Sequence, residues 1–410
     1  MVGTMNQVVA EAYLFANFHV TRCLDDPTFD AECLPKLDRN FYYRCLLAVS
    51  RSNIRKGTLG ESLTASMDAF DGLRPEGCPK TDVRPWGQVV ADLSIQMATM
   101  ACNSVWSNLS KIIVKYLRLK YPSLKKHFDR IVKAVVQFPK SDINNFVPSN
   151  IGNAVEVKSV INHLWSLLPT STGNQFNTRS HLTMRLFHSV LSELVSSSSS
   201  EPNRRAPRLF SLLPRKIGFT ISYIPISSMT FMKILSMGNT PLEKIRGDGR
   251  LEDYDRLWRK YFNIGSVETK ASRFDCRIIT DGKGVSIQMR RELGQCLMET
   301  SGYPKDSSIG ECLNATTHRN ARCVGVDPGM TDIATVAFSS GGGTQSFSSS
   351  HFSHTAGYKT SKRRTDKWNV ETSELVNSIP TSMTTSMDGL ERHVQAYLGA
   401  LPTLLKHRTN

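Results

Sequence analysis

The chain has 410 residues, 40% of them hydrophobic, so it is long enough to bury the cores of two or three domains and is not disordered throughout. Its 51 lysines and arginines outnumber its 36 aspartates and glutamates, and the net charge of +15 favours a polyanionic partner. No apolar run approaches the roughly 20 residues that cross a bilayer, so we expect no membrane partner.

Cysteine usage and the opening residues bear on the cellular compartment. The nine cysteines are widely scattered and form no C-x-x-C pair, which favours a reducing compartment and predicts neither a disulfide scaffold nor a zinc site. The opening MVGTMNQVVAEAYLFANFHV lacks the basic start of a signal peptide. We therefore expect a nuclear or cytoplasmic protein that is not secreted.

Residues 1–195 show mainly helical periodicity, with apolar residues such as Leu186 and Val190 recurring on one face. A loop rich in glycine and proline interrupts this pattern at 71–87. The polar and basic residues 196–210 contain too few apolar side chains to pack. The sequence therefore predicts a helical lobe followed by a linker.

After the linker the pattern changes to short strands with one helix between them. The stretch 218–226 has the apolar and β-branched residues typical of a strand, and 251–262 has the pattern of a short helix. Two strands are predicted within 274–289 around an Asp-Gly turn, in which Gly282 and Gly284 are expected to supply positive φ angles.

Residues 322–338, R-C-V-G-V-D-P-G-M-T-D-I-A-T-V-A-F, predict two strands joined by a Pro-Gly turn. Asp327 stands where the first strand ends, and a carboxylate on a rigid element suits a Mg²⁺ ion, which prefers oxygen ligands. On spacing alone, an aspartate that caps the turn is the commoner explanation. A glycine and serine tip at 339–350 follows, and then a basic segment and helical sequence to the end.

The motif V-G-V-D-P-G-M-T-D-I-A-T-V resembles the first RuvC motif of the TnpB and Fanzor family of transposon-associated, RNA-guided DNA nucleases. The segments 274–289 and 351–368 are similar to that family's hairpin before the nuclease domain and to the basic stretch after the first motif. The resemblance implies that Asp327 is a catalytic ligand of Mg²⁺ on the first strand of an RNase H-like fold. It also implies a guide RNA and a target DNA as partners.

The expected fold class is α+β with several domains. The resemblance implies a helical recognition-like lobe over 1–195, a linker over 196–210, a β-rich, WED-like nucleic-acid-binding module over 211–320 and the start of a RuvC/RNase H-like domain over 321–410. The sequence stops in a helical pattern without a C-cap, so we expect a C-terminally truncated member of the family.

The rest of the RuvC site is not evident in the sequence. Two-metal cleavage needs several carboxylates, yet only Asp327 stands in a matching context. Glu371, Glu374 and Glu391 fall in helix-like sequence, and Asp332 is too close along the hairpin to replace a missing ligand. The expected function is therefore Mg²⁺-dependent, RNA-guided DNA cleavage when complete, with this chain inactive. The alternatives are a catalytically dead protein that keeps guide-RNA or DNA binding, and an actin-like ATPase.

The densest basic cluster lies near the C-terminal end and has an aromatic residue at each edge. It consists of Lys359, Lys362, Arg363, Arg364 and Lys367, between Tyr358 and Trp368. Cations for phosphates beside rings for bases predict contact with RNA or DNA. A solvated loop and a nuclear import signal are the alternatives, and the import-like run K-T-S-K-R-R favours the nucleus over the cytoplasm.

A second basic group is predicted on a helix of the N-terminal lobe. Lys111, Lys115 and Arg118 follow the i, i+4, i+7 spacing and therefore share one face. Such a stripe predicts either a solvated surface or a contact with the backbone of guide RNA or target DNA.

Overall fold

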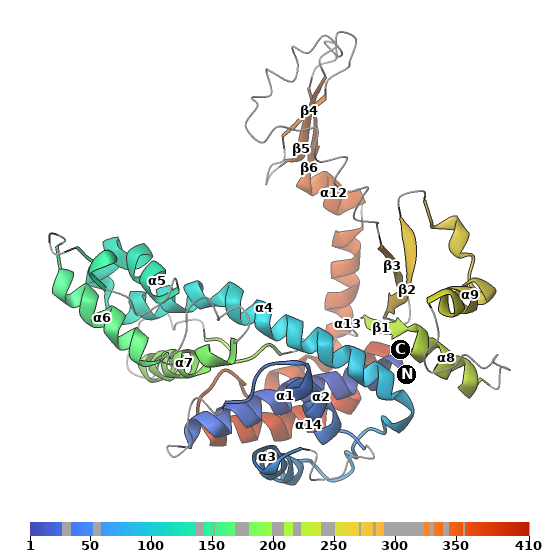
Figure 1. Cartoon of the computed structure of the whole chain (residues 1–410), viewed down its shortest axis with the longest axis horizontal. Coiled ribbons are helices and arrows are strands. Elements are labelled where there is room, and N and C mark those ends of the chain that lie inside the picture. Colours follow the sequence, from blue (N-terminus) through green and yellow to red (C-terminus); the bar gives the residue numbers. More distant parts are fainter. Residues whose placement is uncertain are drawn as a thin grey trace. The chain divides into compact units, whose positions relative to one another are not determined.

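The structure is a computed structural model, and it contains helices with two small antiparallel sheets, so the fold class is α+β as expected (Figure 1). The chain forms two compact units. The first comprises Met1–Val267, Phe274–Gln288 and Ser378–Asn410, and the second comprises Glu268–Arg273 and Met289–Asn377. The described residues are 1–26, 34–51, 59–136, 143–148, 150, 152–168, 180–198, 209–215, 223–238, 251–269, 272–281, 284–290, 324–327, 332–338, 344–355 and 357–409.

Helices make up most of the first unit, as the periodicity of its N-terminal part predicts. The helices are α1 (Val2–Asp25), α2 (Arg39–Ala48), α3 (Glu61–Gly72), α4 (Gly87–Lys120), α5 (Phe128–Val136), α6 (Ala154–Ser166), α7 (Met184–Ser198), α8 (Ser228–Met237), α9 (Leu251–Tyr261) and α14 (Met387–Thr409). Short 3₁₀ turns lie at η3 (Arg84–Trp86), η4 (Pro122–His127), η5 (Ile143–Asn145), η6 (Ser180–Thr183) and η7 (Ile264–Ser266).

Helix α1 is the centre of the first unit and is buried along most of its length. Phe15 and Phe18 are fully buried, and both rings meet the ring of Phe70 in α3 edge-on, with centroids 5.3 and 5.6 Å apart. Helices α2, α3, α7 and α14 pack around α1. A helix buried on all sides depends on its neighbours for stability, because most helical stability comes from packing of this kind.

The buried polar residues of α1 attach distant parts of the chain to it. The Asn17 amide donates to the carbonyls of Tyr13 and Pro214, and its oxygen accepts the Leu213 N–H at 3.0 Å. The Glu11 carboxylate accepts hydrogen bonds from Gln7 at 3.0 Å and from Arg74 at 2.7 Å. These contacts, formed away from water, fix residues 209–215 and the segment after α3 against α1.

The C-terminal helix α14 also belongs to this helical core. Leu401 and Leu405 pack with Ala10 of α1, and Tyr397 lies against the same cluster. Burial raises the pKa of the Tyr397 phenol, with the nearby Glu11 carboxylate adding to the effect. α14 therefore follows the second unit in the sequence but belongs to the helical core of the first unit.

Helix α4 connects two groups of helices in the first unit. It packs against α2 at one part of its length and against α5 and α7 at another (Figure 1). Leu109, Ile113 and Leu117 form its buried face, and the helix ends before Pro122, which begins η4. Proline suits the first turn of a helix and disfavours helical conformation in the residue before it, so this break follows directly from the sequence.

The sheet of the first unit consists of β1 (Ile224–Ser227), β2 (Arg273–Thr280) and β3 (Val285–Arg290), in that order. β1 and β2 are antiparallel. The hairpin of β2 and β3 and the helix α9 are confirmed as expected. The strand expected over 218–226 is observed as β1, while its first residues lie outside the described part of the chain.

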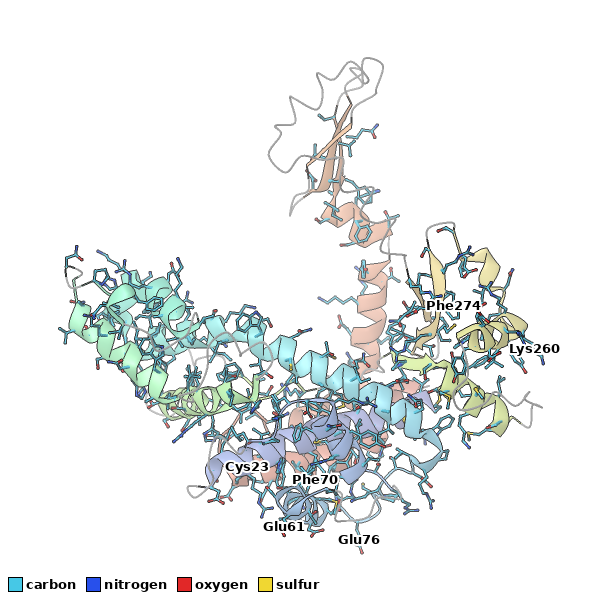
Figure 2. The ribbon with its side chains drawn as sticks, viewed as in Figure 1. Cys23, Glu61, Phe70, Glu76, Lys260 and Phe274 are labelled. Carbon is cyan, nitrogen blue, oxygen red and sulfur yellow. The ribbon has the colours of Figure 1, made fainter. Side chains whose placement is uncertain are left out.

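A tryptophan cluster joins this sheet to α8 and α9. Trp258 is fully buried and stacks on Phe231 with centroids 4.4 Å apart, and Phe274 of β2 (Figure 2) meets it edge-on at 5.3 Å. The Trp258 indole N–H donates to Ser228 at 2.9 Å, and the Ser228 hydroxyl donates to the Cys276 carbonyl at 3.1 Å. These contacts satisfy the polar atoms of a large buried side chain.

The turn of this hairpin differs in one respect from the expectation. Gly284 does not have a positive φ, and Gly282 lies outside the described residues. Instead, the Asp281 carboxylate accepts the Gly284 N–H at 2.7 Å, and the Thr280 hydroxyl donates to the Gly284 carbonyl at 2.7 Å. Side-chain hydrogen bonds therefore close the turn at Gly284.

The second unit contains a three-stranded antiparallel sheet followed by two helices. Its elements are β4 (Val324–Asp327), β5 (Asp332–Phe338), β6 (Thr344–Ser348), α12 (Ser349–Thr355) and α13 (Tyr358–Ser378), the last of which ends at the border with the first unit. The predicted pair β4 and β5 is confirmed. The glycine and serine tip expected over 339–350 is wrong in part, because this stretch contains β6 and the start of α12.

The compact units do not coincide with the segments expected as domains. Part of the expected linker is helical, since α7 continues to Ser198, and Phe210 packs edge-on against Phe187 at 5.9 Å. α14, within the expected nuclease domain 321–410, packs on α1. The expected domain identities and boundaries stay predictions. None of the helices in the described part of the chain has the length and apolar composition needed to cross a membrane.

Replacing Asn17 tests the attachment of residues 209–215 to α1. Asn17→Ala should lower the free energy of unfolding by about 1–3 kcal/mol, because the buried Leu213 N–H loses its acceptor. Asn108→Ala is a matched control, since this side chain of α4 bonds only within its own helix, to Ser104. Urea unfolding of both variants measures the difference. Equal, small losses would show that the Asn17 bonds contribute little.

Candidate nucleic-acid interface

Asp327 ends β4, at the strand end that the sequence predicts. It pairs with Thr335 of β5, which in turn pairs with Ser346 of β6. Residues directly opposite each other in an antiparallel sheet share a face, so the positions beside Asp327 carry hydroxyl groups and not carboxylates. The Asp327 side chain and the turn at 328–331 lie outside the described residues. The role of Asp327 as a Mg²⁺ ligand stays a prediction.

The acidic residues singled out in the sequence do not form a metal site in the described part of the chain. Within it, no three His, Cys, Asp or Glu side chains gather as potential metal ligands. Glu371 and Glu374 lie in α13 and Glu391 in α14, in helices as the sequence predicts, and Asp332 begins β5. The described residues therefore do not assemble the carboxylate set that two-metal cleavage requires.

The predicted basic cluster forms the N-terminal half of α13. Lys362, Arg363 and Lys367 are exposed, and helical geometry places all three on one side of the helix. Lys359 and Arg364 lie on the same helix, with side chains outside the described part. The cluster is thus helical, which excludes the alternative of a solvated loop.

The position of these cations is unfavourable for an isolated helix. A helix N-terminus carries partial positive charge, so acidic residues are favoured in the first turn and basic residues in the last. α13 has neither. Like charges four residues apart, such as Arg363 and Lys367, add a repulsion of about 0.2–0.5 kcal/mol per pair. Asp366, four residues after Lys362 and three after Arg363, offsets part of this repulsion.

Aromatic side chains adjoin the cations of the second unit. Tyr358 is 60% exposed, Phe352 is 40% exposed and Phe347 is 41% exposed. Sequence reasoning found Tyr358 but missed Phe347 and Phe352, because single phenylalanines in a serine-rich stretch are equally compatible with core positions. The burial of a strand or helix face shows in the sequence only where apolar residues recur periodically.

The stripe on α4 is helical as predicted, but part of it has internal contacts. Lys111 and Arg118 are exposed. The Lys115 ammonium lies over the ring of Phe210, 5.8 Å from its centroid, and Lys120 at the end of the helix pairs with Glu193 of α7. Lys115 therefore contributes to packing of residues 209–215, and α4 presents a weaker cationic surface than the sequence suggests.

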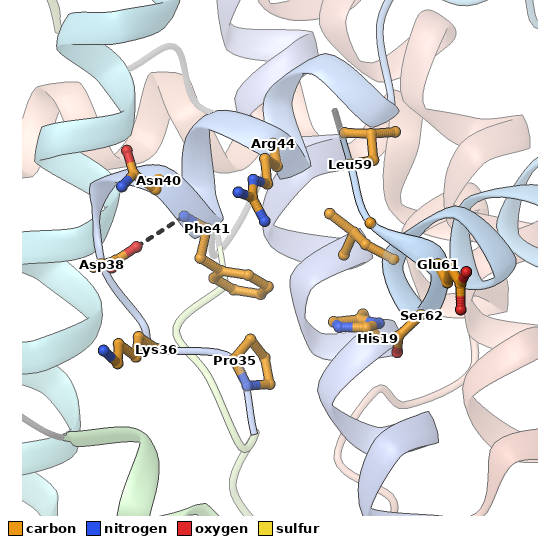
Figure 3. Close-up of a pocket in the computed structure, with 12 residues that line it drawn as sticks. His19, Pro35, Lys36, Asp38, Asn40, Phe41, Arg44, Leu59, Glu61 and Ser62 are labelled. Atoms are coloured by element: carbon orange, nitrogen blue, oxygen red, sulfur yellow. Dashed lines mark hydrogen bonds between the residues drawn. The ribbon is translucent and has the colours of Figure 1, made fainter. Parts of the chain in front are cut away.

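A pocket with a volume of about 510 Å³ lies between α1, α2 and the start of α3 (Figure 3). Lys36 and Arg44 line it together with Asp38 and Glu61, so charges of both signs are balanced. Asp38 accepts the Phe41 N–H at 2.9 Å and thereby caps α2. The lining does not select a ligand of one charge.

His19 lines this pocket, and the buried Cys23 lies next to His19. His19 shares a hydrogen bond of 2.9 Å with the Ser66 hydroxyl, and the Cys23 sulfur lies 3.8 Å from His19 Nε2. Burial, with a smaller effect of the Arg22 charge, lowers the pKa of His19 to about 4, and burial raises the pKa of the Cys23 thiol. A weakly basic imidazole and a protonated thiol make a poor base and nucleophile near neutral pH, so the geometry assigns them a packing role.

Comparison with known proteins does not name a family for the chain. No model of a known protein family matches it, and no curated protein matches it either.

The low pKa of His19 predicts loss of stability in mild acid. The unfolded imidazole takes up a proton below about pH 6.5, whereas the folded one does so only near its pKa of about 4. The His19 contribution to stability is therefore complete above about pH 6.5 and falls by up to about 3 kcal/mol as the pH approaches 4.

Urea unfolding of a His19→Gln variant between about pH 4.5 and pH 7.5 checks this expectation. The variant should show a shallower loss of stability in acid. Half-buried His188 and buried His393, whose pKa values burial also lowers, will retain part of the slope. Exposed His163 provides the control His163→Gln, which should keep the full slope. An unchanged slope in His19→Gln would contradict the expectation.

Proposed function

We propose that the chain binds nucleic acid as a relative of the TnpB and Fanzor RNA-guided DNA nucleases, with guide RNA and target DNA as its partners. The observation that carries this proposal is the exposed cationic half of α13, formed by Lys362, Arg363 and Lys367 and located after the Asp327 strand in the same unit. The net charge of +15 supports the same partner class.

The physical basis of binding is neutralisation of phosphates. Each lysine or arginine that contacts a phosphate releases condensed counterions, so affinity falls as salt rises. The charge repulsion within α13 falls at the same time, because the phosphates lie among its cations. Binding and ordering of this helix are therefore coupled in the proposal.

For catalysis, we propose a binding protein that does not itself cut DNA. By the family resemblance, Asp327 would supply one ligand for Mg²⁺, and the ion would stabilise the charge of the reacting phosphate. Thr335, which pairs with Asp327, and Ser346, which pairs with Thr335 on the next strand, are not the carboxylates that a second ion needs. The alternative, a complete RNA-guided nuclease, requires further carboxylates beside Asp327.

Charge reversal on α13 tests the binding proposal. Arg363→Glu should weaken binding of a labelled RNA hairpin by about tenfold and reduce the salt dependence of the affinity, because at least one phosphate contact is lost. Arg256→Glu on α9 is the matched control, since Arg256 is also exposed and lies outside the cationic cluster. Fluorescence anisotropy across a salt series gives both quantities. A wild-type affinity independent of salt would rule out the proposal.

Nicking of supercoiled plasmid with Mg²⁺ or Mn²⁺ tests the catalytic part. The wild-type chain and Asp327→Ala should both leave the plasmid intact, since a single carboxylate does not hold two metal ions in reactive geometry. Asp327→Ala should bind the RNA hairpin as the wild type does, because it leaves the cations of α13 unchanged. Metal-dependent nicking that disappears in Asp327→Ala would show that the chain holds a complete site.

A further inference from the structure

Three exposed aromatic side chains of the second unit form a continuous row. The ring centroids of Phe347 and Phe352 are 6.0 Å apart, and those of Phe352 and Tyr358 are 5.9 Å apart. The planes of successive rings are inclined by 72° and 49°, so the rings touch without covering one another face to face. Together, Phe347, Phe352 and Tyr358 form the aromatic row.

Local backbone features hold the aromatic row in place. Phe347 lies in β6, Phe352 in α12 and Tyr358 at the start of α13. The Ser348 hydroxyl accepts the His351 N–H at 3.1 Å at the start of α12. Gly357 has a φ of 73° and donates its N–H to the His354 carbonyl at 3.1 Å, which ends α12 and allows α13 to begin at the next residue.

The aromatic row continues into the cationic cluster. Tyr358 and Lys362 are four residues apart on α13, and residues at this spacing share one face of a helix. Arg363 follows directly, and both cations are exposed. A ligand that crosses this surface therefore meets half-exposed rings first and positive charges next.

This order of groups matches the chemistry of a single nucleic-acid strand. Unpaired bases present apolar faces that stack on aromatic rings, and the linked phosphates are held by lysine and arginine. In a duplex the bases are already stacked on one another inside the helix, and only phosphates and groove edges are accessible. Rings that are half exposed to water therefore contribute affinity for unpaired nucleotides and little for a duplex.

We propose that the aromatic row is a stacking site for unpaired bases, which makes the surface of α12 and α13 selective for single-stranded nucleic acid. The inference rests on the proposed function, because the cations of α13 supply the phosphate contacts. Phe347, Phe352 and Tyr358 are then specificity-determining residues, and Lys362 and Arg363 supply affinity for any polynucleotide. The alternative is that the rings only pack the junction of β6, α12 and α13.

The experiment compares three labelled probes of equal length with the full chain at one salt concentration. The probes are oligothymidylate, an abasic strand with the same phosphates and no bases, and a DNA duplex. The wild type should bind oligothymidylate at least about tenfold more tightly than the abasic strand, within the range expected for stacked bases. The double variant Phe352→Ala with Tyr358→Ala should bind both strands equally while keeping its affinity for the duplex.

Two further variants separate stacking from loss of structure. Phe352→Leu with Tyr358→Leu keeps apolar bulk at the junction but removes the ring faces, so it should melt like the wild type and still lose the preference for bases. Val376→Ala removes an exposed apolar side chain elsewhere on α13 and should change nothing. A preference that survives the leucine variant would overturn stacking as its cause.

The outcomes distinguish this inference from the proposed function. Equal binding of oligothymidylate and the abasic strand by the wild type would overturn the inference and leave the proposed function standing. Absence of binding to all three probes would overturn the proposed function. Loss of the base preference in the aromatic variants, with an unchanged affinity for the duplex, supports both.

Discussion

The structure of the first unit depends on the burial of α1 on nearly all sides. A helix in that position cannot leave its polar groups in water, so each one needs a partner from another part of the chain. Asn17 obtains its partners from Leu213 and Pro214, and Glu11 obtains one from Arg74. The apolar side chains of α1 also have to be shielded from water, and α14 packs on α1 and shields part of them. One hydrophobic helix thus organises segments that are far apart in sequence.

In the second unit, unlike the first, the helices leave most of their described side chains exposed to water. On α13, Lys362, Arg363 and Lys367 are exposed, and none of them forms an ion pair within the described part of the chain. On α4, by contrast, Lys115 and Lys120 already have partners in Phe210 and Glu193. A basic residue with an internal partner must give it up to bind phosphate, so α13 offers the lower cost of binding.

Local patterns allowed several elements to be predicted from the sequence. Periodicity predicted the helices around α1, and the Asp-Gly turn predicted the hairpin of β2 and β3. The strand end at Asp327 followed from an apolar run before a Pro-Gly turn. The return of α14 could not be predicted, because packing between distant segments leaves no signature in either one alone. β6 was not predicted, because its sequence T-Q-S-F-S shows no alternation of apolar and polar residues. The strand is largely exposed, and its backbone groups pair it with β5.

The basic residues of the candidate site could be predicted, because charged residues can be read directly from the sequence. The basic run around Arg363 could be found directly, but its helical form was not predicted, and the helix aligns charges that a loop would scatter. The contribution of the aromatic row could not be inferred, because exposure of Phe347 and Phe352 depends on where β6 and α12 end. Burial of apolar surface stabilises a protein by roughly 25 cal/mol per Å², and a half-exposed ring gains only part of this free energy. Where such rings adjoin repelling cations, a ligand that covers the rings and neutralises the charges lowers both costs together.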